Sequence, residues 1–388
     1  NNTDAQKFKI IPTEVSEYSK EFEDGKYIIK SSLESKKVLD ITSANKANGT
    51  NVRFYNSNST KAQIWNLEYD GDGEYIIRSL INPKLVLTAD SYNVVSSKYI
   101  GANSQKWFFD KNGDKTTIIN KENGRYLSNT DDNALLSDTL TGSNNLVLSE
   151  YTNTITYKGI DVSKHNGNIS WEEVANYVDF AIIRAGYADE TILSNGTDKY
   201  EDIKYTTNVE ECEKYNIPYA LYFYSYANKV NNSDRPNYNK TNGESAESEA
   251  SHMINLMKKI TDKGYYPTMK TSVYFDQEDD SIIDKTMDIN ILTGMINKFC
   301  NTMKSNNHNC GVYASKYWFN NRVNVLSIAD KYSIWVAQWP GINNYNDALN
   351  TKTSYNTTPY KLWQFSSNGS IPGISGNVDL DIGYNIFD

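Results

Sequence analysis

The feature that most limits the fold of this chain is a repeat in its first third. The run Asp24-Gly-Lys-Tyr-Ile-Ile-Lys-Ser31 returns as Asp72-Gly-Glu-Tyr-Ile-Ile-Arg-Ser79, and a weaker copy begins near Asp114. Each copy is followed by a second short apolar segment, and Gly, Asn and Asp separate the segments. Short strands at a period of roughly 40 residues predict an all-β domain, because one such unit alone cannot bury its apolar face.

The ends of the units carry a short signature. The first two close with Gln63-Ile-Trp65 and Gln105-Lys-Trp107, and the third has Asn145-Leu-Val147 where the signature should fall. In this threefold setting residues 22–152 resemble the ricin-type β-trefoil lectins, preceded by a polar leader segment at residues 1–21. The Gln and Trp side chains also have a purely structural interpretation, so a trefoil without a working sugar site stays open.

The first unit is the best equipped to bind a carbohydrate. A sugar offers paired hydroxyls on one edge and an apolar ring face, which suits a carboxylate beside an aromatic ring. The positions that match the lectin family are Asp40, Tyr55, Asn58 and Gln63. Because Thr88 and Ser128 replace the carboxylate in the other units, we expect at most one binding unit.

From Tyr157 onward, short apolar segments alternate with longer segments, of which two have helical periodicity. We expect strands at 159–162, 180–184, 218–226, 272–278, 311–315, 333–338, 361–365 and 378–382, and helices at 244–260 and 289–304. This alternation predicts an irregular (β/α) TIM-like barrel, in which catalytic groups lie at the C-terminal ends of the strands.

Acidic residues stand at the strand positions that such a barrel brings together. Asp161 ends the first strand, Asp276 and Glu278 end the fourth, and Asp379 lies on the last. Asp276 and Glu278 are two residues apart, so both point to one side of the strand and Gln277 points away. Two neighbouring acids raise the pKa of one of them, and a neutral acid beside an ionised one is what glycoside cleavage requires.

Over residues 157–388 the chain resembles the glycoside hydrolase family 25 lysozymes, which are N-acetylmuramidases. The matching runs are Gly159-Ile-Asp-Val-Ser-Lys-His-Asn-Gly167, Ile169-Ser-Trp171, Phe180-Ala-Ile-Ile-Arg-Ala-Gly-Tyr187, Tyr222-Phe-Tyr-Ser-Tyr226, Tyr274-Phe-Asp-Gln-Glu-Asp279, Gly311-Val-Tyr-Ala-Ser315, Leu362-Trp-Gln-Phe-Ser-Ser367 and Val378-Asp-Leu-Asp381. Their order along the chain makes the resemblance specific.

The resemblance implies a role for each acid. Glu278 would be the general acid, Asp276 would orient or polarise the substrate, and Asp161 and Asp379 would complete an acidic floor. Asp381 departs from the family, which often has Asn there, and we expect it to point outward.

Four further residues are candidate substrate contacts. Tyr222 and Tyr224 share a strand face and could stack on sugar rings, as could Tyr313 on a later strand. Arg184 ends a strand and could pair with the acids. For each of them, packing inside the barrel is an equally good interpretation.

Composition excludes several classes of function. A formal net charge of −9 argues against nucleic acid or an anionic membrane as the main partner, and no run approaches the ~20 apolar residues of a membrane span. The chain has 3 Cys and 3 His with no close cluster, so no metal or organic cofactor is expected. We expect three free thiols, with a Cys300–Cys310 staple as the alternative.

The resulting hypothesis is a monomeric muramidase that cuts β-1,4 bonds in peptidoglycan glycan strands. The lectin-like module would target it, binding a second cell-surface carbohydrate. Such a protein would be secreted and associated with a cell wall, or released as a phage endolysin. The alternatives are a catalytically silent two-domain carbohydrate-binding protein and a glycosidase acting on a related N-acetylated glycan such as chitin.

Overall fold

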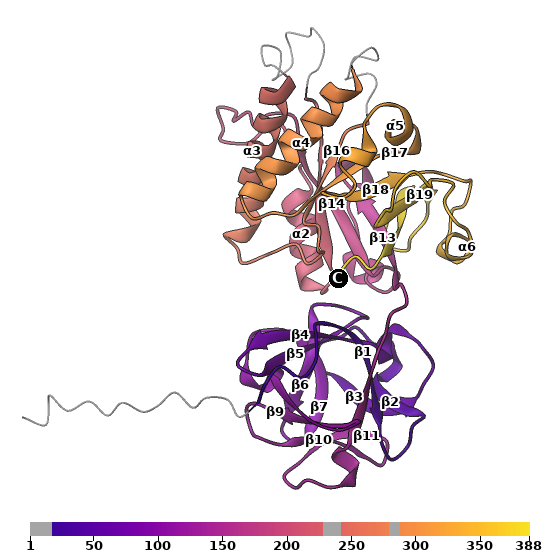
Figure 1. Cartoon of the computed structure of the whole chain (residues 1–388). Coiled ribbons are helices and arrows are strands. Elements are labelled where there is room, and N and C mark those ends of the chain that lie inside the picture. Colours follow the sequence, from indigo (N-terminus) through magenta and orange to yellow (C-terminus); the bar gives the residue numbers. More distant parts are fainter. Residues whose placement is uncertain (1–17, 228–241, 279–287) are drawn as a thin grey trace, which may run out of the picture. The chain divides into compact units, whose positions relative to one another are not determined.

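The computed structural model of the chain describes residues 18–227, 242–278 and 288–388 (Figure 1). Most of the expected leader, residues 1–17, lies outside the described residues. The chain divides into two compact units, with the boundary between Asn153 and Thr154. In the described ranges no helix is long and apolar enough to cross a membrane.

The N-terminal unit consists of a six-stranded ring and three hairpins. In order of pairing, the ring strands are β1 (Gly25–Ser31), β4 (Trp65–Gly71), β5 (Glu74–Ser79), β8 (Trp107–Asn112), β9 (Lys115–Asn120) and β12 (Leu146–Glu150), which pairs again with β1. The hairpins are β2 (Lys37–Ile41) with β3 (Thr50–Asn56), β6 (Leu85–Asp90) with β7 (Asn93–Lys98), and β10 (Tyr126–Thr130) with β11 (Asn133–Ser137). The expected β-trefoil architecture is therefore confirmed.

The repeated signature holds each trefoil unit together from inside. The indole Nε1 atoms of Trp65 and Trp107 donate to the carbonyl oxygens of Leu39 and Leu87, at 3.0 and 2.9 Å. The Gln of the signature ends a short 3-10 turn in the first two units, at Lys61–Gln63 and Asn103–Gln105.

The third unit has the equivalent turn one residue earlier than expected, at Gly142–Asn144. Asn144 takes the place of the Gln and donates to the carbonyl oxygen of Leu127 at 3.3 Å, and Leu146 fills the place of the Trp. Alignment on Asn145-Leu-Val147 was wrong because two adjacent Asn residues offer the same amide and only the turn decides between them.

The C-terminal unit is a closed barrel of eight strands, all eight of them expected from the sequence. They are β13 (Thr156–Val162), β14 (Phe180–Tyr187), β15 (Tyr219–Tyr224), β16 (Val273–Asp276), β17 (Cys310–Ser315), β18 (Ser333–Ala337), β19 (Leu362–Gly369) and β20 (Val378–Tyr384). Strands β13 to β19 run parallel, whereas β20 runs antiparallel to both β19 and β13. The barrel is confirmed, but its last strand departs from the all-parallel TIM arrangement.

Helices lie outside the barrel strands (Figure 1). They are α1 (Trp171–Val174), α2 (Tyr205–Lys214), α3 (Asn242–Thr261), α4 (Ile289–Ser305), α5 (Lys316–Asn321) and α6 (Tyr345–Asn350), with 3-10 turns at Lys164–Asn166 and Val325–Ser327. A further 3-10 turn, at Thr42–Ala44, belongs to the trefoil. The two predicted helices correspond to α3 and α4. Their apolar faces are buried against the barrel, as in the ring stacking of Phe275 on Phe299 at 4.2 Å.

A disulfide joins the last third of α4 to the start of β17. Cys300 and Cys310 are bonded, with their Cα atoms 5.2 Å apart, and Cys212 is buried and outside the disulfide. The expectation of three free thiols was therefore wrong. The short helix-to-strand connection brings the two residues into bonding distance, and spacing in the sequence alone does not show this.

Candidate active site

The first and last strands of the barrel bring two of the predicted acids together. Asp161 on β13 is directly opposite Asp379 on β20 in the strand register. Because β20 runs antiparallel, its beginning lies beside the end of β13, which is the barrel end where parallel strands present catalytic groups. Both acids therefore reach the mouth, although one stands late in its strand and the other early.

The fourth strand contributes the predicted carboxylate pair. Asp276 is the last residue of β16 and lies in register between Tyr224 and Tyr313. Glu278, expected at the end of the strand, follows two residues after it and is partly buried. Gln277 is buried and turns outward, with its Nε2 4.0 Å from the sulfur of Met295 on α4. This confirms the expected alternation of the three side chains.

A single buried amide ties the first acid to its aromatic neighbours. Gln364 on β19 donates from Nε2 to Oδ2 of Asp161 at 2.7 Å. Its Oε1 accepts from the Tyr313 hydroxyl at 3.0 Å and from the Trp339 indole at 3.1 Å. Gln364 therefore fixes the orientation of Asp161 and joins it to a half-exposed tryptophan.

Asp381 corrects a prediction. It is fully buried, with 0% of its surface exposed, and its Oδ1 accepts from Nε1 of Trp335 at 2.8 Å. It lies opposite Gly159 on one side and Gln364 on the other. The expected outward orientation was wrong because side chains two apart on a strand share a face, so Asp381 follows Asp379 to the inside.

Three of these carboxyl groups have raised pKa values. Burial, followed by the charges of Asp379 and Asp381, raises the pKa of Asp161 well above its usual range, while the bond from Gln364 opposes the shift. Burial raises the pKa of Asp379 to about 6. Burial also raises the pKa of Asp381, against the bond from Trp335. The barrel interior thus favours proton-bearing carboxyl groups.

The negative charges of all four predicted acids act on the hydroxyl of Tyr313. Burial raises its pKa, and the next causes are the negative charges of Glu278, Asp276, Asp161 and Asp379. Asp161, Asp276 and Asp379 likewise add to the effect of burial on Tyr222. The acids therefore act electrostatically on one shared space.

The candidate substrate contacts lie in different environments. Tyr222 and Tyr313 are buried and pack against the ring of Trp335, with centroids 6.1 and 4.4 Å away, while Tyr224 is partly exposed. Arg184 binds Asp202 through Nε at 2.7 Å. Its partner in this bond is therefore a loop residue, whereas the sequence suggested the candidate catalytic acids. Trp339, which the sequence argument passed over, is 56% exposed.

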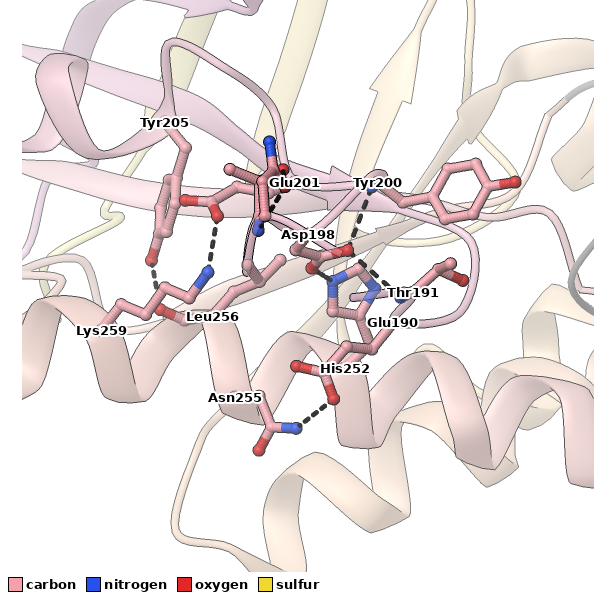
Figure 2. A network of polar contacts seen from close by, with 12 residues as sticks. Glu190, Thr191, Asp198, Tyr200, Glu201, Tyr205, His252, Asn255, Leu256 and Lys259 are labelled. Carbon is pink, nitrogen blue, oxygen red and sulfur yellow. Dashed lines mark hydrogen bonds and ion pairs between the residues drawn. The ribbon is translucent and has the colours of Figure 1, made fainter. Parts of the chain in front are cut away.

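The loop that carries Asp202 is held against α3 by several polar contacts (Figure 2). His252 lies between Asp198 and the carbonyl oxygen of Ala188, and Asn255 donates to Glu190 at 3.0 Å. Lys259 pairs with Glu201 at 2.6 Å. These contacts fix the loop and, through Asp202, the guanidinium of Arg184.

The trefoil brings its predicted residues together in the first unit. Gln63 donates to Asp40 Oδ2 at 3.1 Å and accepts from the backbone amide of Asn58 at 2.7 Å. Arg53 binds Asp40 Oδ1 at 3.0 Å and lies over the ring of Tyr55, 4.0 Å from its centroid. Gln63 is 1% exposed, whereas Tyr55 is 41% exposed.

Comparison of the three trefoil units separates the residues that form the common structural frame from those that form the candidate sugar site. Gln105 and Asn144 make internal amide bonds like those of Gln63, so this amide belongs to the frame. The carboxylate with its arginine is specific to the first unit, since Thr88 and Ser128 stand in its place. Within the described ranges, no group of three or more His, Cys, Asp or Glu side chains is arranged to hold a metal ion.

Two family models match the chain. The one described as Glycosyl hydrolases family 25 covers residues 160–374, and the one described as Ricin-type beta-trefoil lectin domain covers residues 26–146. A search of curated proteins finds no match.

Among solved structures, the modular autolysin LytC of Streptococcus pneumoniae, solved with a synthetic peptidoglycan ligand, is 22% identical; the match covers 74% of this chain and 71% of that one, with a TM-score of 0.44. The bacterial lysozyme of Streptomyces coelicolor is 21% identical, over 58% and 90%, with a TM-score of 0.42. The designed threefold-symmetric protein ThreeFoil is 24% identical, over 33% and 100%, with a TM-score of 0.30. Because the first family model spans more than half of the chain, this protein belongs to glycosyl hydrolase family 25 and carries a ricin-type β-trefoil lectin domain.

Proposed function

We propose that the protein is a muramidase that hydrolyses the β-1,4 bond between N-acetylmuramic acid and N-acetylglucosamine in peptidoglycan. The observation that carries this proposal is the grouping of four acids around Tyr313. Asp276 is opposite Tyr313 in the strand register, and Glu278 follows Asp276 by two residues. Gln364 bonds Tyr313 to Asp161, which is opposite Asp379. Cleavage of a glycosidic bond needs a proton for the leaving oxygen and negative charge against an oxocarbenium-like transition state. A group of carboxyls in a partly buried space supplies both.

The roles of the acids follow from their positions. Glu278 is the general acid, because it stands just beyond the end of β16 and is more exposed to an incoming sugar than Asp276. Asp276, buried between Tyr224 and Tyr313 in the strand register, polarises the substrate, most directly its N-acetyl group. Asp161 and Asp379 form the acidic floor beneath them.

Spacing along the strand bears on the stereochemical course. Residues two apart on one strand face are separated by about 6.5–7 Å, whereas retaining enzymes hold their two carboxyls roughly 5–5.5 Å apart. This disfavours Asp276 as a covalent nucleophile. Participation of the N-acetyl group, or direct attack by water, is the course that this spacing favours.

Sugar contacts extend outward from the acids. Tyr224, which is partly exposed, and Trp339, which is exposed, offer rings near the mouth, and Gln364 links Trp339 to Asp161. Tyr222, Tyr313 and Arg184 act from behind, by packing and by fixing their neighbours. A sugar ring stacked on Trp339 would thus be held in a fixed relation to the acidic floor.

The trefoil contributes a second carbohydrate site in its first unit. Asp40 is 3% exposed and already accepts bonds from Arg53 and Gln63, so its carboxylate orients Arg53. Arg53 and the exposed ring of Tyr55 then face the ligand, and Asn58 closes the edge. Binding at this unit would hold the enzyme on a cell surface between cleavage events.

The Cys300–Cys310 disulfide supports action outside the cell, since such bonds persist in oxidising compartments. A catalytically silent carbohydrate-binding protein is the alternative from another class. The raised pKa values of Asp161, Asp379 and Asp381 speak against it, because carboxyl groups with strongly shifted pKa values cluster at functional sites.

The test compares wild type with Glu278→Gln on a purified peptidoglycan suspension and identifies the new reducing ends by mass. We expect wild type to clear the suspension and leave muramic acid at the reducing ends, and the variant to be at least ~10²–10⁴-fold slower. Glu210→Gln is the matched control, because Glu210, on α2, is an exposed residue that pairs with Lys263 and lies outside the acidic group. Chitin oligomers cut in preference to peptidoglycan, or equal rates for wild type and Glu278→Gln, would refute the assignment.

A further inference from the structure

The fully buried carboxylate of Asp381 is the strongest feature that the proposed mechanism leaves unused. One of its oxygens, Oδ1, accepts from Trp335. The other, Oδ2, is inaccessible to solvent, and no donor from the described part of the chain reaches it. A buried acceptor without a donor destabilises a fold, so the environment of this oxygen requires an explanation.

Asp161 supplies the explanation, because it is the neighbour of Asp381 across the strands. Gly159 is opposite Asp381 and Asp161 is opposite Asp379, so the three acids lie on one face of the β13–β20 ladder. The side chains of Asp161 and Asp381 are within hydrogen-bonding reach of each other. Two ionised carboxylates only accept, so a bond between them exists only when one carries a proton.

We propose that Asp161 and Asp381 share one proton across the β13–β20 ladder, and that Asp381 is a positioning residue that holds Asp161 through this bond. This inference rests on the role given above to Asp161 in the acidic floor. Gln364 holds one oxygen of Asp161 from β19, and the shared proton holds its carboxyl group from β20. The pair carries one negative charge in place of two.

The surroundings of Asp381 favour this arrangement. The titratable groups that act on the pair are Asp379 on β20, Tyr274 on β16, Tyr313 on β17, Tyr222 on β15 and Tyr345 on α6. Asp379 adds a further negative charge, and the tyrosines are neutral at ordinary pH because burial raises their pKa values. The guanidinium on the neighbouring strand, Arg184, is already bound to Asp202. Release of the proton would leave three negative charges side by side, two of them on the buried side chains of Asp161 and Asp381.

The test is infrared spectroscopy of the full chain, in which a protonated carboxyl has a carbonyl-stretch band that a carboxylate lacks. We expect the band in wild type at neutral and mildly alkaline pH and its loss in Asp381→Asn, whose amide donates to Asp161 without a shared proton. In Asp262→Asn the band stays, because Asp262 is an exposed partner of Lys258. No band in wild type, or a band kept in Asp381→Asn, overturns the proposal.

A second variant covers the case in which Asp381→Asn fails to fold. Trp335→Phe removes the donor that stabilises ionised Asp381, so the band should persist to higher pH than in wild type; an unchanged titration overturns the proposal. The pH profile of kcat/KM should lose one alkaline ionisation in Asp381→Asn. The infrared bands need no substrate, so the two proposals can fail separately. If the protein shows the shared proton but does not cut peptidoglycan, this inference stands and the proposed function is refuted.

Discussion

Replacement of Asp379 by Asn should stabilise the barrel at neutral pH and leave its stability unchanged in acid. Burial raises the pKa of Asp379 to about 6 in the folded protein, whereas an unfolded chain gives an Asp a pKa of about 3.9. Below about pH 3 the carboxyl is neutral in both states and contributes nothing. As pH rises toward 6, the unfolded state ionises more easily than the folded state, so ionisation favours unfolding.

The size of the effect follows from the two pKa values. They differ by about two, and each pKa unit is worth roughly 1.4 kcal/mol, so ionisation of Asp379 destabilises the folded barrel by up to about 3 kcal/mol above pH 6. Interaction with Asp161 and Asp381 spreads part of this energy over three groups, so about 1–3 kcal/mol is the expected gain for Asp379→Asn. The same change removes part of the acidic floor and should lower muramidase activity.

Hydrogen exchange measured by mass spectrometry is the suitable assay, because it reports the opening free energy of β13 and β20 separately from the trefoil. Peptides from the trefoil serve as an internal reference, and Asp262→Asn as a control for the loss of one exposed charge. Equal protection of β20 in wild type and Asp379→Asn at about pH 8, or a gain that is as large at about pH 4, would show that the raised pKa does not reflect strain in the folded state.

Two further predictions concern binding and positioning. Tyr55→Ala should weaken carbohydrate binding by the trefoil about tenfold, the worth of one stacked ring, in a pull-down or calorimetric titration with cell-wall glycans. Tyr92→Ala is the control, since Tyr92 is also exposed beneath an arginine but lies in another unit. Equal losses of binding in the two variants would count against the first-unit site. Gln364→Met keeps side-chain length but removes the bond to Asp161, so kcat should fall about 10- to 100-fold while KM changes less; a change confined to KM would show that Gln364 serves substrate binding alone.

The elements of this fold were predictable because their signals are local. A strand shows its alternation within a few residues, and all eight barrel strands and both long helices follow from such patterns. The orientation of Gln277 away from Asp276 and Glu278 is a direct result of that alternation. What the sequence could not supply was pairing between distant segments, such as the antiparallel entry of β20 beside β13.

The site residues that were not predicted also divide into those with a local signal and those that depend on distant pairing. Asp381 was within reach of the sequence argument, because it stands two residues from Asp379 and must share its face. Gln364 and Trp339 could not be identified as site residues from the sequence, because their contact with each other depends on the register of β18 against β19. The Cys300–Cys310 bond depends likewise on the close return of β17 to the last third of α4, which residue spacing does not determine.

The antiparallel strand β20 also has a consequence for folding of the barrel. It closes the barrel between β13 and β19, and it carries Asp379 and Asp381 to the mouth. Asp161 and Gln364, which are bonded to each other, are 203 residues apart in the chain. A chain in which β20 has not yet paired therefore has neither a closed barrel nor an assembled acidic floor. Closure of the barrel and assembly of the floor are one folding event, and it needs contacts between the most distant strands of the unit.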